Sequence, residues 1–182
     1  MGNEARSARL AHTMDRNGRR LGLLIGWVMA LLLVNPMASD AATRLSGDAV
    51  YDGTQCPAPP AGYEDFTSYP GFALTGSLEG CLYTKVISTK ETPSGVYLES
   101  GEEVFIGSLD GGTVGTFATT YRFESKWDPD VSTGVEVHGR CQHPIVEGSG
   151  TAGFEGAKGR LDFKDIIGDP VTYVYRGHIS LR

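Results

Sequence analysis

Histidine and cysteine side chains are the first candidates for chemistry, because they could hold a metal ion. His138, Cys141 and His143 lie within the segment HGRCQHP, and His178 lies near the C-terminus. Imidazoles and a thiolate are zinc ligands, but this spacing fits no standard zinc finger or catalytic zinc pattern. The alternative is that His138 is a surface strand residue and that His143, followed by Pro144, shapes a turn. We therefore expect no metal site.

Four glutamates could supply the paired carboxyl groups that acid–base chemistry requires. Glu99, Glu102 and Glu103 lie in LESGEEVF, and Glu124 lies in a later strand-like segment. Glycoside hydrolases use such pairs, so a barrel or jelly-roll hydrolase is one interpretation. Acidic residues on both sides of Gly101 are more typical of an exposed hairpin or bulge, and the chain has no G-x-S-x-G motif. The sequence therefore assigns no catalytic residue.

Tyrosines are spread over several apolar segments of the chain. Their rings with a polar hydroxyl suit the lining of a pocket, and they suit a barrel core equally well. If the domain binds a ligand, we expect the pocket to be lined by Tyr83, Tyr97, Tyr121, Phe123 and Tyr173.

The segments that must position these residues are β-strands. After Pro70, runs rich in Val, Ile, Thr, Tyr and Phe alternate with Gly, Asp and Pro clusters, and no helix-length stretch has an apolar stripe. Asp110-Gly111-Gly112 predicts a tight turn. The expected strands are Ala73 to Glu79, Cys81 to Thr89, Val96 to Gly107, Gly112 to Trp127, Gly134 to Gln142, Ile145 to Gly150, Gly159 to Ile166 and Val171 to Leu181.

This strand content predicts an all-β domain formed by one closed antiparallel barrel of about eight strands, with little helix outside the N-terminal segment. A two-sheet sandwich is the alternative, but a barrel leaves no exposed edge. The barrel is expected over residues 71–182. Residues 42–70 are expected to be an irregular N-terminal arm, since Pro57, Pro59 and Pro60 interrupt any period.

Alternation within the predicted strands indicates one apolar face and one wet face. Phe117, Tyr121 and Phe123 share a face of their strand. In the segment 134–142, the same alternation places Val135, Val137 and Cys141 opposite Glu136, His138 and Arg140.

Residues 148–163, GSGTAGFEGAKGRLDF, form the most distinctive segment of the chain. A glycine-rich turn leads to an aromatic residue, Phe154, and the chain returns to a strand at Gly159. We expect Phe154 to be a buried plug and Gly153, Gly156 and Gly159 to serve backbone geometry. No Walker lysine-serine pair and no helix follow, so a phosphate site is disfavoured and no cofactor is expected.

This segment resembles the G-x-G-x-F-x-G-A-x-G element of the allene oxide cyclase-like and dirigent β-barrels, and of related bacterial secreted barrels. The resemblance implies an eight-stranded, calycin-like barrel whose apolar interior holds a small hydrophobic molecule. In the plant members the interior steers cyclisation of a fatty-acid epoxide or coupling of phenoxy radicals. Their catalytic residues do not match residues of this chain, so no enzymatic role follows.

Cys56, Cys81 and Cys141 leave one cysteine over if one disulfide forms. Cys81 and Cys141 both lie in strand-like segments, whereas Cys56 lies in a proline-rich stretch. We therefore expect a Cys81–Cys141 bridge, with Cys56–Cys81 as the alternative.

The N-terminus is typical of an export signal. Five arginines precede the apolar run Leu21 to Val34, and Ser39 and Ala41 suit a cleavage site. We expect residues 1–41 to be a signal peptide, with a retained anchor or a twin-arginine signal as alternatives. The domain is then secreted, periplasmic or in the cell envelope, with no stable membrane insertion after cleavage. The net charge of −6 disfavours nucleic acid as a partner.

Three functions are compatible with such a domain. The first is an exported barrel that binds a small hydrophobic or amphipathic molecule, the second an isomerase or cyclase of the allene oxide cyclase-like type, and the third a secreted protein-interaction module. The first two predict a cavity of about 300 Å³ or more. An ionisable side chain in that cavity would favour the enzyme, and an apolar lining would favour simple binding.

Overall fold

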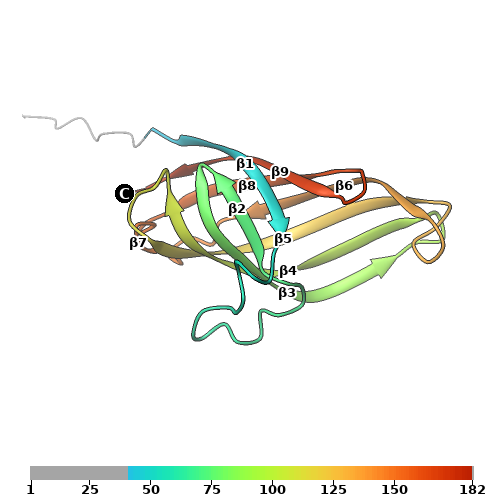
Figure 1. Ribbon diagram of the computed structural model, residues 1–182, viewed down its shortest axis with the longest axis horizontal. Helices are drawn as coiled ribbons and strands as arrows, with labels where there is room; N and C mark the ends of the chain where they lie inside the picture. The colour runs from blue at the N-terminus through green and yellow to red at the C-terminus, as the bar shows by residue number, and fades with distance from the viewer. Residues whose placement is uncertain (1–40, 182) are drawn as a thin grey trace, which may run out of the picture. The chain divides into compact units, whose positions relative to one another are not determined.

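The computed structural model describes residues 41–181, which form nine β-strands and no helix (Figure 1). The predicted signal peptide therefore lies outside the described residues, except for Ala41. Within the described range, no helix is present that could cross a membrane. In chain order the strands are β1 (Thr43–Tyr51), β2 (Phe72–Gly76), β3 (Leu78–Glu91), β4 (Val96–Leu109), β5 (Gly115–Asp128), β6 (Val135–Pro144), β7 (Thr151–Ala152), β8 (Lys158–Ile166) and β9 (Thr172–Ser180).

Eight of these strands form a closed antiparallel barrel, as predicted. Around the ring, β1 to β6 follow one another, then come β8 and β9, and β9 pairs with β1. Pairing of β4 with β5 completes the ring, and β7 pairs with the start of β5 outside it. Because each strand of the ring has two hydrogen-bonded neighbours, the barrel presents no open sheet edge.

Seven of the eight predicted strands correspond to β2–β6, β8 and β9. The predicted strand from Ile145 to Gly150 is wrong, because there Ile145 makes only an isolated bridge to Thr119. The predicted turn at Asp110 is present, and Asp110 and Gly111 both have positive φ angles, 49° and 69°.

The prediction of an irregular arm over 42–70 is wrong for residues 43–51, which form β1 inside the ring. Leu45 and Ala49 point inward with Gly47 between them. A glycine and an alanine therefore interrupt the alternation of large apolar residues that would identify β1 as a strand. Gly47 is required there because a Cβ would collide with the ring of Tyr175. Residues 52–71 are a loop without strands.

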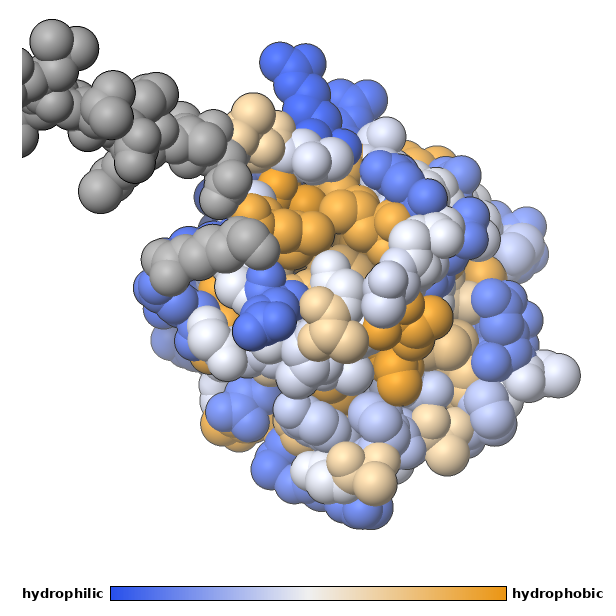
Figure 2. Space-filling model, turned by 90° about the vertical axis from the view of Figure 1, so that its left-hand side faces the viewer, coloured by the Kyte–Doolittle hydropathy of each residue, from blue (hydrophilic) through white to orange (hydrophobic). Residues whose placement is uncertain are grey.

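One end of the barrel is packed with apolar side chains. Phe154 is fully buried, as predicted, and its ring lies 5.6 Å from that of Phe105 and 5.0 Å from that of Phe117. A Cβ at Gly153 would collide with a backbone carbonyl, and Gly156 has a φ of 71°. Figure 2 shows the end where β7 lies, with hydrophobic residues at its middle and hydrophilic residues around them.

The disulfide joins Cys56 to Cys81, with a Cα–Cα distance of 5.7 Å, and Cys141 is free and buried. The predicted Cys81–Cys141 pairing is therefore wrong and the alternative is right. Cys81 packs in an outer cluster with Cys56, Phe66 and Tyr83, under the 52–71 loop. Cys141 belongs to the inner core, so the barrel wall separates the two thiols.

A β-bulge reverses the predicted faces at the start of β6, whereas His138 and Arg140 face outward and Cys141 inward as predicted. Lys126 pairs with His138 but Trp127 pairs with Glu136, so Val137 is the extra residue. Val135 and Val137 are consequently exposed, at 68% and 50%, and Glu136 turns inward. The expectation that both valines share the inner face with Cys141 is wrong for this reason.

Candidate functional site

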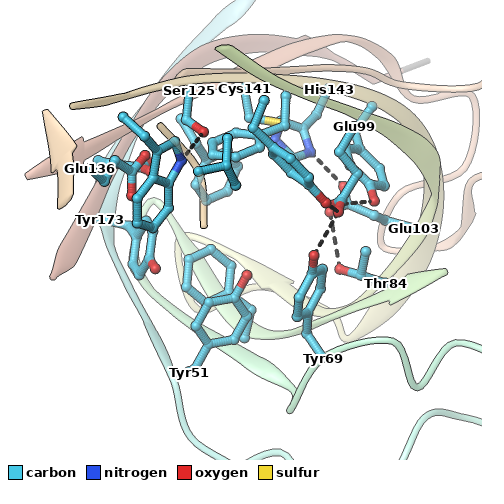
Figure 3. Close-up of a pocket in the computed structure, with 18 residues that line it drawn as sticks. Tyr51, Tyr69, Thr84, Glu99, Glu103, Ser125, Glu136, Cys141, His143 and Tyr173 are labelled. Carbon is cyan, nitrogen blue, oxygen red and sulfur yellow. Dashed lines mark hydrogen bonds and ion pairs between the residues drawn. The ribbon is translucent and has the colours of Figure 1, made fainter. Parts of the chain in front are cut away.

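The end of the barrel opposite the phenylalanine core is hollow. A cavity of about 320 Å³ lies between the strands and reaches the β1–β2 and β5–β6 loops, where Tyr69 and Val131 line it (Figure 3). This volume meets the size expected for a ligand site. The titratable non-tyrosine side chains of the lining are Glu99, Glu103, Glu136, Cys141, His143 and Asp165, and its aromatic side chains are Tyr51, Tyr69, Phe72, Tyr97, Tyr121, Phe123, Trp127, Phe163 and Tyr173.

Four of the five aromatic residues that the sequence singled out line this cavity. They are Tyr97, Tyr121, Phe123 and Tyr173. Tyr83 does not, because alternate residues of β3 face opposite sides of the barrel wall and Tyr83 faces outward, under the 52–71 loop. The structure thus brings four candidates together and places the fifth outside the barrel.

Glu99 is held by three phenolic hydroxyl groups. Tyr69 and Tyr97 each donate to its Oε2 at 2.6 Å, and Tyr121 donates to its Oε1 at 2.7 Å. The carboxyl group accepts all three bonds, so both of its oxygens have donors. Burial and the adjacent Glu99 charge raise the pKa of Tyr97 to about 12 and raise the pKa of Tyr121 further, so the phenols remain protonated donors.

Glu103 lies four residues after Glu99 on the same face of β4 and is only 4% exposed. Its direct cross-strand partners are Thr84 on β3 and Thr119 on β5. Thr84 donates to Oε1 at 3.2 Å and Thr119 donates to Oε2 at 2.9 Å. His143 Nδ1 lies 2.5 Å from the same Oε2. The register of three strands therefore fixes this carboxyl group against one histidine nitrogen.

His143 carries a second nitrogen that has no protein partner. The side chain is 5% exposed, its ring stacks on Tyr121 at 5.9 Å and lies 4.6 Å from the ring of Phe163. Its Nε2 has no hydrogen bond within residues 41–181. Because buried polar atoms are nearly always satisfied, the missing partner of Nε2 is a water or a bound molecule.

A second pair of carboxyl groups, Glu136 and Asp165, also lines the cavity, and Figure 3 shows Glu136 on the side opposite Glu99 and Glu103. Burial first, and then the neighbouring Asp165 carboxyl, raise the pKa of Glu136 to about 7. Burial also raises the pKa of Asp165. Two carboxyl groups this close disfavour double ionisation, so the pair holds a proton near neutral pH.

Cys141 brings a thiol, a potential nucleophile, into the cavity lining, but this thiol is not activated. Burial first, and then the charges of Glu103 and Asp165, raise its pKa. Since the thiolate is the reactive form, Cys141 acts as an apolar wall residue. No group of three or more His, Cys, Asp or Glu side chains in the described part of the chain is placed to hold a metal ion.

Sequence reasoning missed most of the polar lining. It interpreted Glu99 and Glu103 as parts of an exposed hairpin, whereas both are buried and only Glu102 points outward. The signal was present: Glu99, Gly101, Glu103 and Phe105 are spaced by two, so the acids share the face of a core phenylalanine. His143 also belongs to an inward face rather than to a turn.

No protein-family model matches this chain, and no curated protein or solved structure matches it significantly.

Proposed function

We propose that this protein is an exported barrel that binds a small amphipathic molecule in its cavity and catalyses proton transfer on it, as an isomerase or cyclase does. The observation that carries this proposal is the His143–Glu103 pair, in which Nδ1 is engaged and Nε2 is free. An apolar lining would have favoured simple binding, but this cavity contains four carboxyl groups and an imidazole.

The pair has the geometry of a general acid–base catalyst. Glu103 accepts from Nδ1–H, which leaves Nε2 of a neutral imidazole as the proton acceptor. Thr84 and Thr119 hold Glu103 in place, and Tyr121 and Phe163 hold the imidazole ring. A bound molecule that presents an acidic C–H or O–H to Nε2 would lose that proton to His143 and could regain it at another position.

Export is the second part of the proposal. The Cys56–Cys81 disulfide fits an extracytoplasmic protein, because such bonds persist in oxidising compartments. The arginine-rich, apolar N-terminal segment supports the same location.

The test begins with the molecule that co-purifies with the protein, identified by mass spectrometry. That molecule is then incubated with the protein in D₂O, and deuterium entering its carbon positions is followed by NMR. We expect the wild-type protein to catalyse the exchange. His143→Gln should still bind the molecule, with exchange slowed about 100-fold or more, the usual contribution of a general base.

Glu102→Gln is the matched control, since Glu102 lies on the outer face of β4 beside Glu103. It should exchange like the wild type. Equal exchange rates in His143→Gln and the wild type would contradict the proposal. Binding without any catalysed exchange would instead support the second candidate, a binding barrel without chemistry, which the many aromatic side chains of the lining favour.

A further inference from the structure

In the part of the chain that the structure describes, the cavity lining carries acidic side chains without matching lysine or arginine. Glu99, Glu103, Glu136 and Asp165 line it, and within the described residues neither lysine nor arginine does. The one basic group of the lining, His143, is already engaged with Glu103. A fatty acid or another anion would enter this cavity against uncompensated negative charge, at low dielectric. The lining therefore selects against anionic molecules.

Glu136 and Asp165 converge on one point of the wall. They belong to the neighbouring strands β6 and β8, and a Cβ at Gly139 would collide with both carboxyl groups. Glycine at position 139 thus leaves the space into which both side chains turn. Glu136 and Asp165 hydrogen-bond to each other through the proton that they share, so Glu136 Oε1 has no other donor within residues 41–181.

Aromatic rings flank this carboxyl pair on both sides. Trp127 on β5 is the direct cross-strand partner of Glu136, and Tyr173 on β9 is the direct partner of Asp165. Across the barrel wall, the adjacent strands β5, β6, β8 and β9 therefore present a tryptophan, a glutamate, an aspartate and a tyrosine side by side. Tyr51 extends the aromatic wall, with its ring 5.5 Å from that of Tyr173. Aromatic faces combined with carboxylates are the usual environment of an organic cation.

We propose that the molecule bound in the cavity is an organic ammonium ion with an aromatic or apolar body, and that its charged group lies between Glu136 and Asp165. The inference rests on the proposed function in that a molecule occupies the cavity. Figure 3 shows Glu136 and Tyr173 on one side of the cavity, and Glu99, Glu103 and Tyr69 on the other. The ammonium group therefore anchors the molecule on one side and directs its body toward His143.

Two buried atoms support an occupant that spans the cavity. His143 Nε2 has no partner in the described part of the chain, and Glu136 Oε1 has none besides the proton shared with Asp165; both residues line the cavity. An ammonium group donates to Glu136, and a polar group on the body of the molecule reaches His143. One molecule thus satisfies both atoms.

Binding of an ammonium ion must displace the proton that the carboxyl pair holds. The other titratable groups near the pair are Tyr173 on β9 and His138 on β6, and the His138 charge favours ionisation of Asp165. Because burial raises the pKa of Glu136 to about 7, the pair is more often protonated at pH 6 than at pH 8. The affinity for an ammonium ion should therefore rise with pH across this interval.

Calorimetric titration with three probes of the same aromatic body tests the inference. The probes are tryptamine, tryptophol and indole-3-acetate, which carry an ammonium, a hydroxyl and a carboxylate. At pH 8 we expect tryptamine to bind the purified protein at least about tenfold more tightly than tryptophol, which corresponds to about 1.4 kcal/mol. Indole-3-acetate should bind most weakly. Tryptamine should also bind severalfold more weakly at pH 6, and tryptophol should not.

Glu136→Gln and Asp165→Asn should remove the preference for tryptamine and leave tryptophol binding unchanged, while Glu102→Gln should change neither. If a variant fails to fold, tryptamine binding to the wild type at pH 6 and pH 8 tests the same role of the carboxyl pair. Equal binding of tryptamine and tryptophol, with no pH dependence, overturns the inference and leaves the proposed function standing. Failure of all three probes to bind also overturns it, and deuterium exchange then decides the proposed function separately.

Discussion

The two ends of the barrel are formed by the same strands and differ in what fills them. On β5, Phe117 packs against Phe105 and Phe154 at one end, whereas Phe123 and Trp127 line the cavity at the other. The three packed rings are at most 1% exposed. The pairing of β5 with β4 has no register shift, whereas its pairing with β6 has a bulge at the hollow end, where Glu136 turns into the cavity.

This difference shows how a small barrel tolerates buried carboxyl groups. Burying a charged or polar group costs free energy unless hydrogen bonds compensate for lost water. Glu99 and Glu103 receive five side-chain hydroxyl bonds between them, and the Glu136–Asp165 pair retains a proton. The remaining cost is offset by apolar burial at the packed end. Stability should therefore depend mainly on the packed end, and binding on the hollow end.

Phe154→Ala should have the largest effect on stability. Removal of a fully buried phenylalanine that packs edge-on against both Phe105 and Phe117 should cost about 3 to 5 kcal/mol. Phe123→Ala is the matched control, because it makes the same substitution in the cavity wall, where the side chain is only partly buried. It should lower the free energy of unfolding by less than half as much. Urea unfolding measures both. Equal losses would break the distinction between the two ends.

The disulfide should have the next largest effect. It closes a loop with a sequence separation of 25 residues, and the chain-entropy relation gives about 3 kcal/mol for such a loop. Urea unfolding of Cys56→Ser should show this loss. The same change frees the 52–71 loop, which carries Tyr69, one of the three donors to Glu99.

Comparison of unfolding with and without a thiol reductant separates this bond from Cys141. The wild type and Cys141→Ala should both lose stability when reduced, because Cys141 takes no part in the bridge. Cys56→Ser should not respond to the reductant. A response of Cys56→Ser, with none from the wild type, would contradict the pairing.

The sequence predicted the packed end better than the hollow end. The barrel, most of its strands and the burial of Phe154 followed from turn residues and apolar alternation, which report on local backbone and on the core. In β1 small inward residues concealed the alternation, and a bulge at Val137 reversed it in β6. Neither feature has a reliable local signal.

The polar cavity was harder to predict because a buried glutamate looks like a surface glutamate in a single sequence. What distinguishes Glu103 is its position between Thr84 and Thr119, which are 19 and 16 residues away along the chain. Such cross-strand neighbours depend on the register, and the register depends on the closed ring. The disulfide pairing failed for a related reason, since strand content did not tell which side of the wall each cysteine faced.

The smallest expected effect is the pH dependence that the Glu136–Asp165 pair gives to stability. Burial raises the pKa of Glu136 from 4.5 to about 7, so between these values the folded state keeps a proton that the unfolded chain has lost. Stability contributed by this group is therefore fully present below pH 4.5 and is lost as the pH rises toward 7. Because Glu136 is partly exposed, the change should be on the order of 1 kcal/mol.

Glu136→Gln cannot ionise at this position, so its free energy of unfolding should fall less than that of the wild type between pH 4.5 and pH 8. Urea unfolding across this range measures the difference, and comparing the two proteins removes contributions from other titrating groups. Glu102→Gln, exposed on the outer face of β4, should follow the wild-type curve. If the Glu136→Gln curve also ran parallel to the wild type, the carboxyl pair would be as well hydrated as the protein surface. The hollow end would then be open to water at this point, and its contrast with the packed end would be confined to Glu99, Glu103 and His143.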